Sequence, residues 1–128
     1  MAQSYIRAAH WYREAADGGH AAAQNNLGLL CEYGKGVEAS DADALQWYYA
    51  AALQGNARAQ SNLAYFYAHG RGLPQSTIDA QVWYERAAAQ GDETAIKALN
   101  SGFIMIMWVI IEYHFIIANE SQKQIKGY

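Results

Sequence analysis

Apolar residues recur along this chain at the period of an α-helix, and the pattern returns after 36 residues. Within residues 41–54 one helical face, at i, i+3, i+4, i+7 and i+8, contains Ala44, Trp47, Tyr48, Ala51 and Ala52. Within residues 57–69 the same spacing selects Ala59, Leu63, Phe66 and Tyr67. The spacing therefore predicts two helices in each repeat, each with one apolar face.

The repeat is clearest at its aromatic and small residues. A tryptophan–tyrosine pair followed by alanines begins at Trp11, Trp47 and Trp83, and the glycines that follow in register are Gly19, Gly55 and Gly91. A period between about 20 and 50 residues is typical of stacked supersecondary units. Small residues let two helix backbones approach closely, and we expect the three tryptophans to fill the space between neighbouring helix pairs.

The predicted helix ends carry the expected capping residues. Ser40-x-x-Asp43 and Ser76-x-x-Asp79 both resemble a capping box. Asn56 and Asp92 are good N-caps for the helices that follow them, whereas His20 is a poorer one. The second helix of a unit is expected to stop at the GKG and GRG sequences, which lack the GK[ST] ending of a phosphate-binding loop.

The sequence AAAQNNLGLLCEYGKGV, followed by DALQWYYAAALQGNARAQSNLAYFYAHGRGL, resembles Sel1-like repeats, which are related to the tetratricopeptide repeat. The resemblance covers residues 4–100. It implies an all-α fold, a right-handed α-solenoid of stacked antiparallel helix pairs, and a scaffold or adaptor that binds other proteins rather than an enzyme. Two departures are Ala64, where the family has the glycine kept as Gly28, and Cys31, where it has the tyrosine kept as Tyr67.

The repeat register predicts three segments. A repeat domain covers 1–100 and contains a half-repeat at 4–19, full repeats at about 20–55 and 56–91, and a partial repeat at 92–100. An apolar helix is expected at 101–119, and a polar tail at 120–128.

The apolar segment FIMIMWVIIEYHFII, residues 103–117, does not follow the repeat. As a helix it would extend about 22 Å, against roughly 30 Å of bilayer hydrocarbon, and Glu112 opposes insertion. A membrane anchor is therefore the less favoured interpretation. The alternatives are a helix that caps the stack, an apolar surface for a homo-oligomer or a partner, and an aberrant end of a truncated repeat gene.

A partner is expected to bind where the units differ. One stripe beside the buried face of residues 57–69 contains Arg58, Asn62, Tyr65 and His69, and the matching stripe of the previous unit contains Asn26, Leu29 and Tyr33 after Ala22. The hypothesis is that these stripes line a groove for an extended or helical peptide, with amides on its backbone and aromatic side chains as anchors. The alternative is that Asn26 and Asn62 bond within the repeat and the tyrosines only pack.

Composition narrows the function further. The net charge of −3 and the lack of a basic block do not favour nucleic-acid binding. The four histidines and Cys31 show no HxxxH or CxxC spacing, so neither a metal site, a catalytic cysteine nor a cofactor is expected. One cysteine and no visible signal peptide favour a cytoplasmic protein.

Overall fold

The computed structural model describes the backbone of residues 2–126 and the side chains of residues 3–101 and 109–125. Over residues 2–126 it contains no strand and the helices α1 (Ala2–Asp17), α2 (Ala21–Tyr33), α3 (Asp41–Leu53), α4 (Ala57–His69), α5 (Thr77–Ala89), α6 (Glu93–Leu99) and α7 (Gly102–Lys126). The chain divides into two compact units, Met1–Ile96 and Lys97–Tyr128. The predicted all-α solenoid is confirmed.

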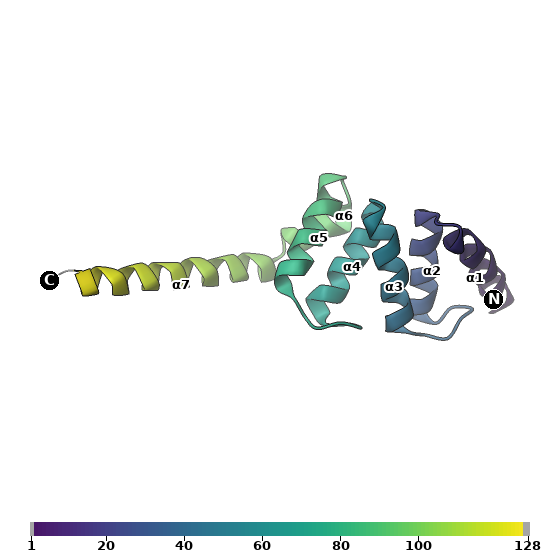
Figure 1. Ribbon diagram of the computed structural model, residues 1–128, viewed down its shortest axis with the longest axis horizontal. Helices are drawn as coiled ribbons and strands as arrows, with labels where there is room; N and C mark the ends of the chain where they lie inside the picture. The colour runs from purple at the N-terminus through teal and green to yellow at the C-terminus, as the bar shows by residue number, and fades with distance from the viewer. Residues whose placement is uncertain (1, 127–128) are drawn as a thin grey trace. The chain divides into compact units, whose positions relative to one another are not determined.

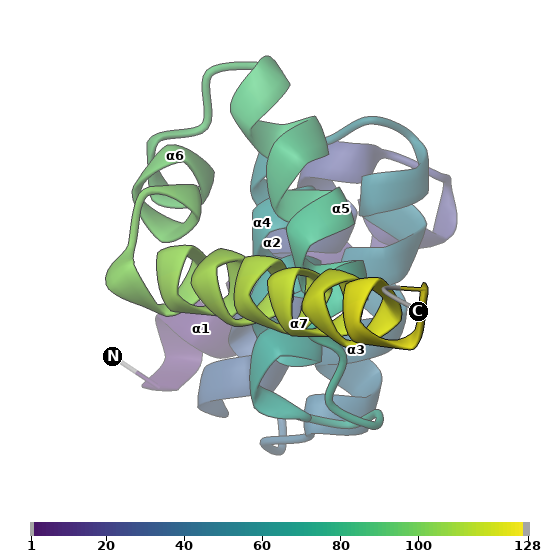
Figure 2. The same cartoon turned by 90° about the vertical axis from the view of Figure 1, so that its left-hand side faces the viewer.

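The first unit is a stack of helices in chain order. Helix α2 packs against α1 and α3, and α4 packs against α3 and α5. Figure 1 shows α1 to α5 following one another along the stack, and Figure 2 views them along its length, with α5 nearer than α1. Each helix therefore contacts mainly its neighbours in sequence, as expected of a solenoid.

The helix ends follow the capping prediction. The side chains of Ser40 and Ser76 accept hydrogen bonds from the backbone N–H groups three residues later, at 3.1 and 3.2 Å. Asn56 does the same at 2.9 Å, whereas His20 makes no side-chain cap bond. Gly34, in the GKG sequence, has a φ of 65° and ends α2 in the left-handed conformation that glycine adopts without strain.

The core of the stack centres on Tyr48, whose side chain is fully buried. Its ring lies against Gly28, where an added Cβ would sit 2.7 Å from the ring carbons Cδ1 and Cε1. The ring also meets Phe66 edge-on, with the ring centroids 5.5 Å apart. Gly28 is therefore the residue that lets α2 approach the tyrosine of α3.

Glutamine side chains connect successive units. Gln24 Nε2 donates to the Ala16 carbonyl at 3.2 Å, and Gln54 Nε2 donates to Gln24 Oε1 at 2.8 Å. The same two hydrogen bonds recur 36 residues later. Gln60 Nε2 donates to the Ala52 carbonyl at 3.2 Å, and Gln90 Nε2 donates to Gln60 Oε1 at 3.0 Å. These carboxamides satisfy buried polar groups between the units.

The prediction for the three tryptophans is wrong for Trp11. Trp83 is buried, with 8 % of its surface exposed, and Tyr49 of the preceding first helix lies edge-on to it at 6.2 Å between ring centroids. Trp47 is half-buried, and the residue in register with Tyr49 is there Arg13. Trp11 is 65 % exposed, and among the described residues no aromatic side chain takes the place that Tyr49 has beside Trp83.

The second unit contains the single long helix α7. This helix runs to Lys126, so residues 120–126 of the predicted polar tail are helical. Large apolar side chains are exposed along its described part, namely Val109, Ile110, Ile111, Tyr113, Phe115, Ile116, Ile117 and Ile125. The side chains of residues 103–108, the first part of the predicted apolar segment, lie outside the described residues. Among the residues that were described, no helix combines the length and the hydropathy needed to cross a membrane.

Candidate partner-binding groove

Two adjoining hollows lie between α2, α4 and the start of α6, and we call them together the central groove. The larger has a volume of about 360 Å³ and the smaller about 70 Å³. Both are lined by Ser61, Asn62 and Thr94, which form the shared part of the groove. The larger hollow is completed by Glu32, Tyr33, Tyr65 and Arg71, and the smaller by Leu29, Arg58 and Asp92.

The structure brings five of the seven predicted binding residues to this groove. They are Leu29, Tyr33, Arg58, Asn62 and Tyr65. The remaining two, Asn26 and His69, are not among the lining residues. The exposed ring of His69 lies against the Tyr65 ring instead, with centroids 4.1 Å apart. His69 is thus placed to hold Tyr65 at the rim of the groove.

Asn62 makes a hydrogen bond to another asparagine of the stack. Its Nδ2 donates to Oδ1 of the buried Asn25 at 3.0 Å, which joins α4 to α2. This bond uses a donor of the Asn62 carboxamide. Within the described part of the chain, the acceptor oxygen of Asn62 receives no hydrogen bond, and Asn62 is half-buried on the groove.

Ser61 is a groove residue that the sequence did not single out. It lines both hollows, and only 3 % of its surface is exposed. Its Oγ has no hydrogen-bond partner, and it is the one buried side-chain oxygen or nitrogen of the described residues in that condition. A buried hydroxyl without a partner costs about 1–3 kcal/mol of desolvation, so its position in a groove calls for an explanation.

The larger hollow is lined by Arg71 and Glu32, which belong to a charged cluster. Arg71 contacts both oxygens of Asp41, with Nε at 3.1 Å and Nη2 at 2.6 Å, and its Nη1 donates to Glu32 Oε2 at 2.9 Å. Glu32 Oε1 accepts the hydroxyl of Tyr48 at 2.7 Å. Both carboxylates therefore have partners, and the guanidinium also lies 4.6 Å from the centre of the Phe66 ring.

The pKa values of this cluster follow from its contacts. Burial, the hydrogen bond to Glu32 and the nearby Glu32 charge raise the pKa of Tyr48 well above 10, its ordinary value. The hydrogen bond to Asp41 is the main cause that raises the pKa of Arg71, against the opposing effect of burial. Tyr48 therefore stays neutral and Arg71 stays charged at all ordinary pH values.

The preceding unit has a different interaction at the positions that correspond to Arg71 and Asp41. Lys35 stands where the next unit has Arg71, and Tyr5 stands where it has Asp41. There the Lys35 ammonium lies 5.7 Å from the centre of the Tyr5 ring, which is a cation–π contact in place of an ion pair. The cluster of Arg71 thus distinguishes the groove from the rest of the repeat.

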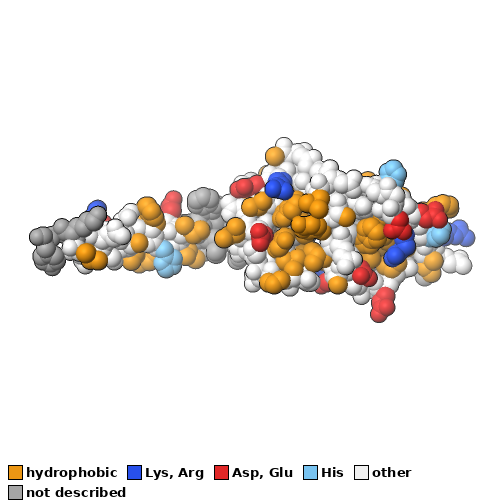
Figure 3. All heavy atoms as spheres, viewed as in Figure 1, with side chains coloured by type: hydrophobic (Ala, Val, Ile, Leu, Met, Phe, Trp, Pro, Cys, Tyr) orange, Lys and Arg blue, Asp and Glu red, His pale blue; other side chains and the backbone are white. Residues whose placement is uncertain are grey.

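A further hollow of about 420 Å³ lies outside the central groove and is lined by Leu45, Gln46, Tyr49, Tyr67 and Leu73. Figure 3 shows hydrophobic side chains gathered over the part of the stack that α3 to α5 occupy. This hollow is largely apolar and contains no charged residue among those described. Its lining therefore provides little to select one partner over another.

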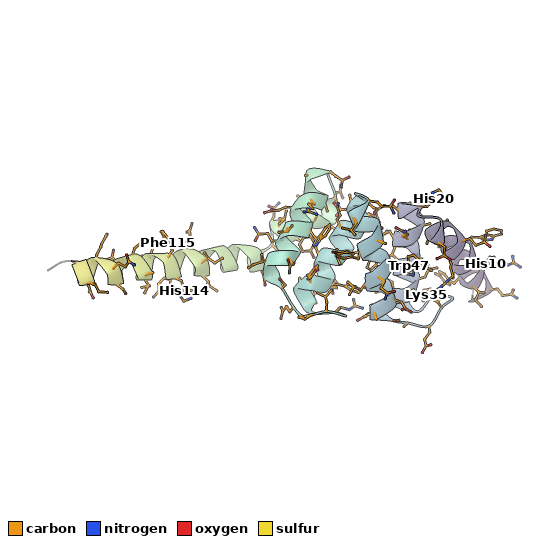
Figure 4. The ribbon with its side chains drawn as sticks, viewed as in Figure 1. His10, His20, Lys35, Trp47, His114 and Phe115 are labelled. Carbon is orange, nitrogen blue, oxygen red and sulfur yellow. The ribbon has the colours of Figure 1, made fainter. Side chains whose placement is uncertain are left out.

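Metal-binding and thiol chemistry have little support in the geometry. No group of three or more His, Cys, Asp or Glu side chains suited to a metal ion occurs in the described part of the chain. His10 lies on α1 and His20 at the turn before α2, while His114 and Phe115 point from opposite sides of α7 (Figure 4). Cys31 is buried, and burial is the main cause that raises the pKa of its thiol, which disfavours the reactive thiolate.

Comparison with known families agrees with the observed repeats. The sequence profile of the Sel1 repeat matches residues 1–20, 21–56 and 57–92. The chain belongs to the Sel1-repeat family. In this Sel1-repeat protein the matched segments correspond to α1, to α2 with α3, and to α4 with α5. Members of the family generally act as scaffolds for protein interactions and are typically not catalytic.

Solved structures extend the comparison. A Sel1 repeat protein from Oxalobacter formigenes is 41 % identical with a TM-score of 0.69, over 71 % of this chain and 68 % of that one. A protective antigen of uropathogenic Escherichia coli strains, c5321, which displays an SLR fold, is 35 % identical with a TM-score of 0.72, over 74 % of this chain and 20 % of the antigen. Cysteine rich protein B of Helicobacter pylori shares the fold, at 24 % identity and a TM-score of 0.67, over 71 % and 68 % of the two chains. Among curated proteins the search found no match.

Proposed function

We propose that this Sel1-repeat protein is an interaction module that holds a peptide segment of a partner protein in the central groove. The observation that carries the proposal is the groove itself, which combines exposed aromatic side chains with buried polar groups. Tyr33 and Tyr65 are 64 % and 43 % exposed, and they line the larger hollow beside Ser61 and Asn62. Pockets that bind ligands commonly combine apolar walls with a few convergent polar groups.

The charges of the groove describe the expected peptide. Glu32 and Arg71 are paired with each other, and the smaller hollow adds one cation, Arg58, and one anion, Asp92. The groove therefore has no large excess of either charge, which favours a peptide recognised by aromatic packing and hydrogen bonds. The lack of a basic block in the sequence argues in the same direction against nucleic acid.

A selection from a displayed library of random peptides tests the proposal, with the full chain as bait. Peptides recovered on the unmodified protein should lose affinity by about tenfold or more when Tyr65 and His69 are both replaced by alanine, because an anchoring tyrosine commonly contributes more than about 1 kcal/mol. The CD spectrum should stay unchanged, since both side chains are exposed.

The matched control is Tyr49→Ala. Tyr49 has the same 43 % exposure as Tyr65 but lies on α3, outside the central groove. This substitution should leave peptide binding unchanged. Equal binding by the unmodified protein and by the Tyr65/His69 double variant would show that the groove is not the binding surface.

We further propose that the module works in the cytoplasm, because its single cysteine is free and buried, which suits a reducing compartment. Immunofluorescence together with fractionation of the source cells tests this. Recovery of the protein from an oxidising compartment would contradict it.

A further inference from the structure

Carboxamide side chains make the polar contacts that join one unit of the stack to the next. Gln54 donates to Gln24, Gln90 donates to Gln60, and Asn62 donates to Asn25, at 2.8, 3.0 and 3.0 Å. In each pair one amide nitrogen meets one amide oxygen. The amide nitrogens of Gln24, Gln60 and Gln90 also donate to backbone carbonyls, at Ala16, Ala52 and Gly55 respectively.

Ser61 stands where this pattern is interrupted. It is in register with Asn25, one repeat of 36 residues earlier, and the position in register with Asn62 is Ala98. Ser61 carries no amide, so it cannot form the carboxamide contact that Asn25 forms in the preceding unit. Serine is also shorter than asparagine, and its position opens onto both hollows of the central groove.

The unpartnered groups at this point match a carboxamide. The Ser61 hydroxyl can donate to a carbonyl oxygen, and the half-buried Asn62 Oδ1 can accept from an amide N–H. A carboxylate could accept from Ser61 but brings no N–H to Asn62 Oδ1, so it satisfies only one of the two groups. The nearby charges do not favour it either, since Arg71 is already bound by Asp41 and Glu32, and Arg58 shares the smaller hollow with Asp92. An ammonium group would leave the Ser61 proton without an acceptor.

We infer that the Ser61–Asn62 part of the central groove is a specificity site for a glutamine or asparagine side chain of the bound peptide. The ligand amide takes the place of the carboxamide that the repeat lacks at this register. This inference rests on the proposed peptide-binding function and names the side chain that the groove selects. Tyr33 and Tyr65 pack against the remainder of the peptide and do not discriminate between carboxamide and carboxylate.

The site is tested by two-dimensional ¹⁵N–¹H NMR of the full 14.2 kDa chain, a convenient size for the method. The probes are three capped amino acids with the same backbone: the N-acetyl N-methylamides of glutamine, glutamate and methionine. The glutamine probe should shift the backbone signals of Ser61, Asn62 and Thr94 in a saturable manner. The other two should bind about tenfold more weakly, since each lacks one or both of the hydrogen bonds to Ser61 and Asn62.

The test variant is Ser61→Ala, with Ser4→Ala on the exposed face of α1 as its matched control. Ser61→Ala should abolish the preference for glutamine and should unfold at the same temperature as the unmodified chain or a higher one. Removal of a buried hydroxyl that has no partner takes away a desolvation cost without breaking a bond. Ser4→Ala should leave both properties unchanged.

Three results overturn the inference: equal shifts by all three probes, a glutamine preference that survives in Ser61→Ala, or no shift at the groove with any probe. Each is distinguishable from failure of the proposed function. If displayed peptides still bind and lose affinity in the Tyr65/His69 variant, the groove binds peptides but does not select carboxamides at Ser61. If no displayed peptide depends on Tyr65, the proposed function itself fails.

Discussion

Replacement of Gly28 by alanine should destabilise the stack, although alanine is the better helix former. The added Cβ would lie 2.7 Å from two carbons of the Tyr48 ring, closer than such atoms approach in practice. Overpacking of this kind costs about 1–3 kcal/mol, and replacement of a helical glycine returns about 0.8–1.0 kcal/mol. A displaced Tyr48 ring also weakens its 2.7 Å hydrogen bond to the Glu32 carboxylate, which is worth about 1.5–3 kcal/mol.

Together these effects predict a net loss of about 2 kcal/mol and a fall in Tm of about 10 °C for a domain of this size. Thermal and urea unfolding, followed by CD and tryptophan fluorescence, measure both quantities. Gly18→Ala is the matched control, because its added Cβ would meet its nearest atom, the Ala15 carbonyl oxygen, at an ordinary 3.4 Å. This variant should retain the stability of the unmodified chain.

The double variant with Tyr48→Leu identifies the cause. A leucine is smaller than the tyrosine ring, so it relieves the contact with the new methyl group. The cost of Gly28→Ala should therefore be smaller in the Tyr48→Leu background than alone, which appears as a coupling energy in a double-mutant cycle. Additive costs, or a Gly28→Ala variant as stable as Gly18→Ala, would refute the role assigned to Gly28.

Three further predictions concern other parts of the stack. Trp83→Ala should lower the free energy of unfolding in urea by about 3–5 kcal/mol, because Trp83 is buried. Trp11→Ala should lower it by no more than about 0.5 kcal/mol, because Trp11 is exposed, and equal losses would contradict this reasoning. Arg71→Leu should destabilise the protein by about 1–3 kcal/mol, because the Glu32 side chain, which is only 9 % exposed, loses its cationic partner. A variant as stable as the unmodified chain would show that the ion pairs of Arg71 contribute nothing to stability. Stability should fall as the pH rises above about 10, the ordinary pKa of tyrosine. Because the pKa of Tyr48 is higher in the folded protein than in the unfolded chain, the stabilisation that its protonated hydroxyl provides is complete below this pH and is lost progressively above it. Far-UV CD and absorbance at 295 nm against pH check this, and the loss should be smaller in Tyr48→Phe.

The repeat and the helix ends could be predicted from the sequence because they depend on local signals. Apolar spacing placed α3 and α4, and the capping residues Ser40, Asn56 and Ser76 mark where helices begin. The exposure of Trp11 could not be read from its motif, since burial depends on what lies beside a helix. Tyr49 covers Trp83, whereas Trp11 has no such neighbour within the described residues.

The central groove was predicted only in part. A helical stripe beside the buried face located Leu29, Asn62 and Tyr65, because that argument needs only the helical period. Thr94 and Arg71 come from outside the two stripes and reach the groove through the stacking of successive units. Ser61 lies on a buried position of α4, and its unpartnered hydroxyl became visible only when the contacts across the stack were known.

The Arg71 cluster makes the stack unevenly coupled along its length. Its two carboxylates come from α2 and from the start of α3, and Arg71 itself follows α4, so it links the segments 21–56 and 57–92. In the next repeat, 36 residues later, Ala68 and Thr77 stand where Glu32 and Asp41 stand in this one. Neither residue has a carboxylate, so these positions cannot form the ion pairs that Arg71 makes. In a chain of nearest-neighbour couplings the weakest junction opens first. Amide protons of α5 should therefore exchange with solvent before those of α3, and the central groove would open from its α6 side while its α2 wall stays folded.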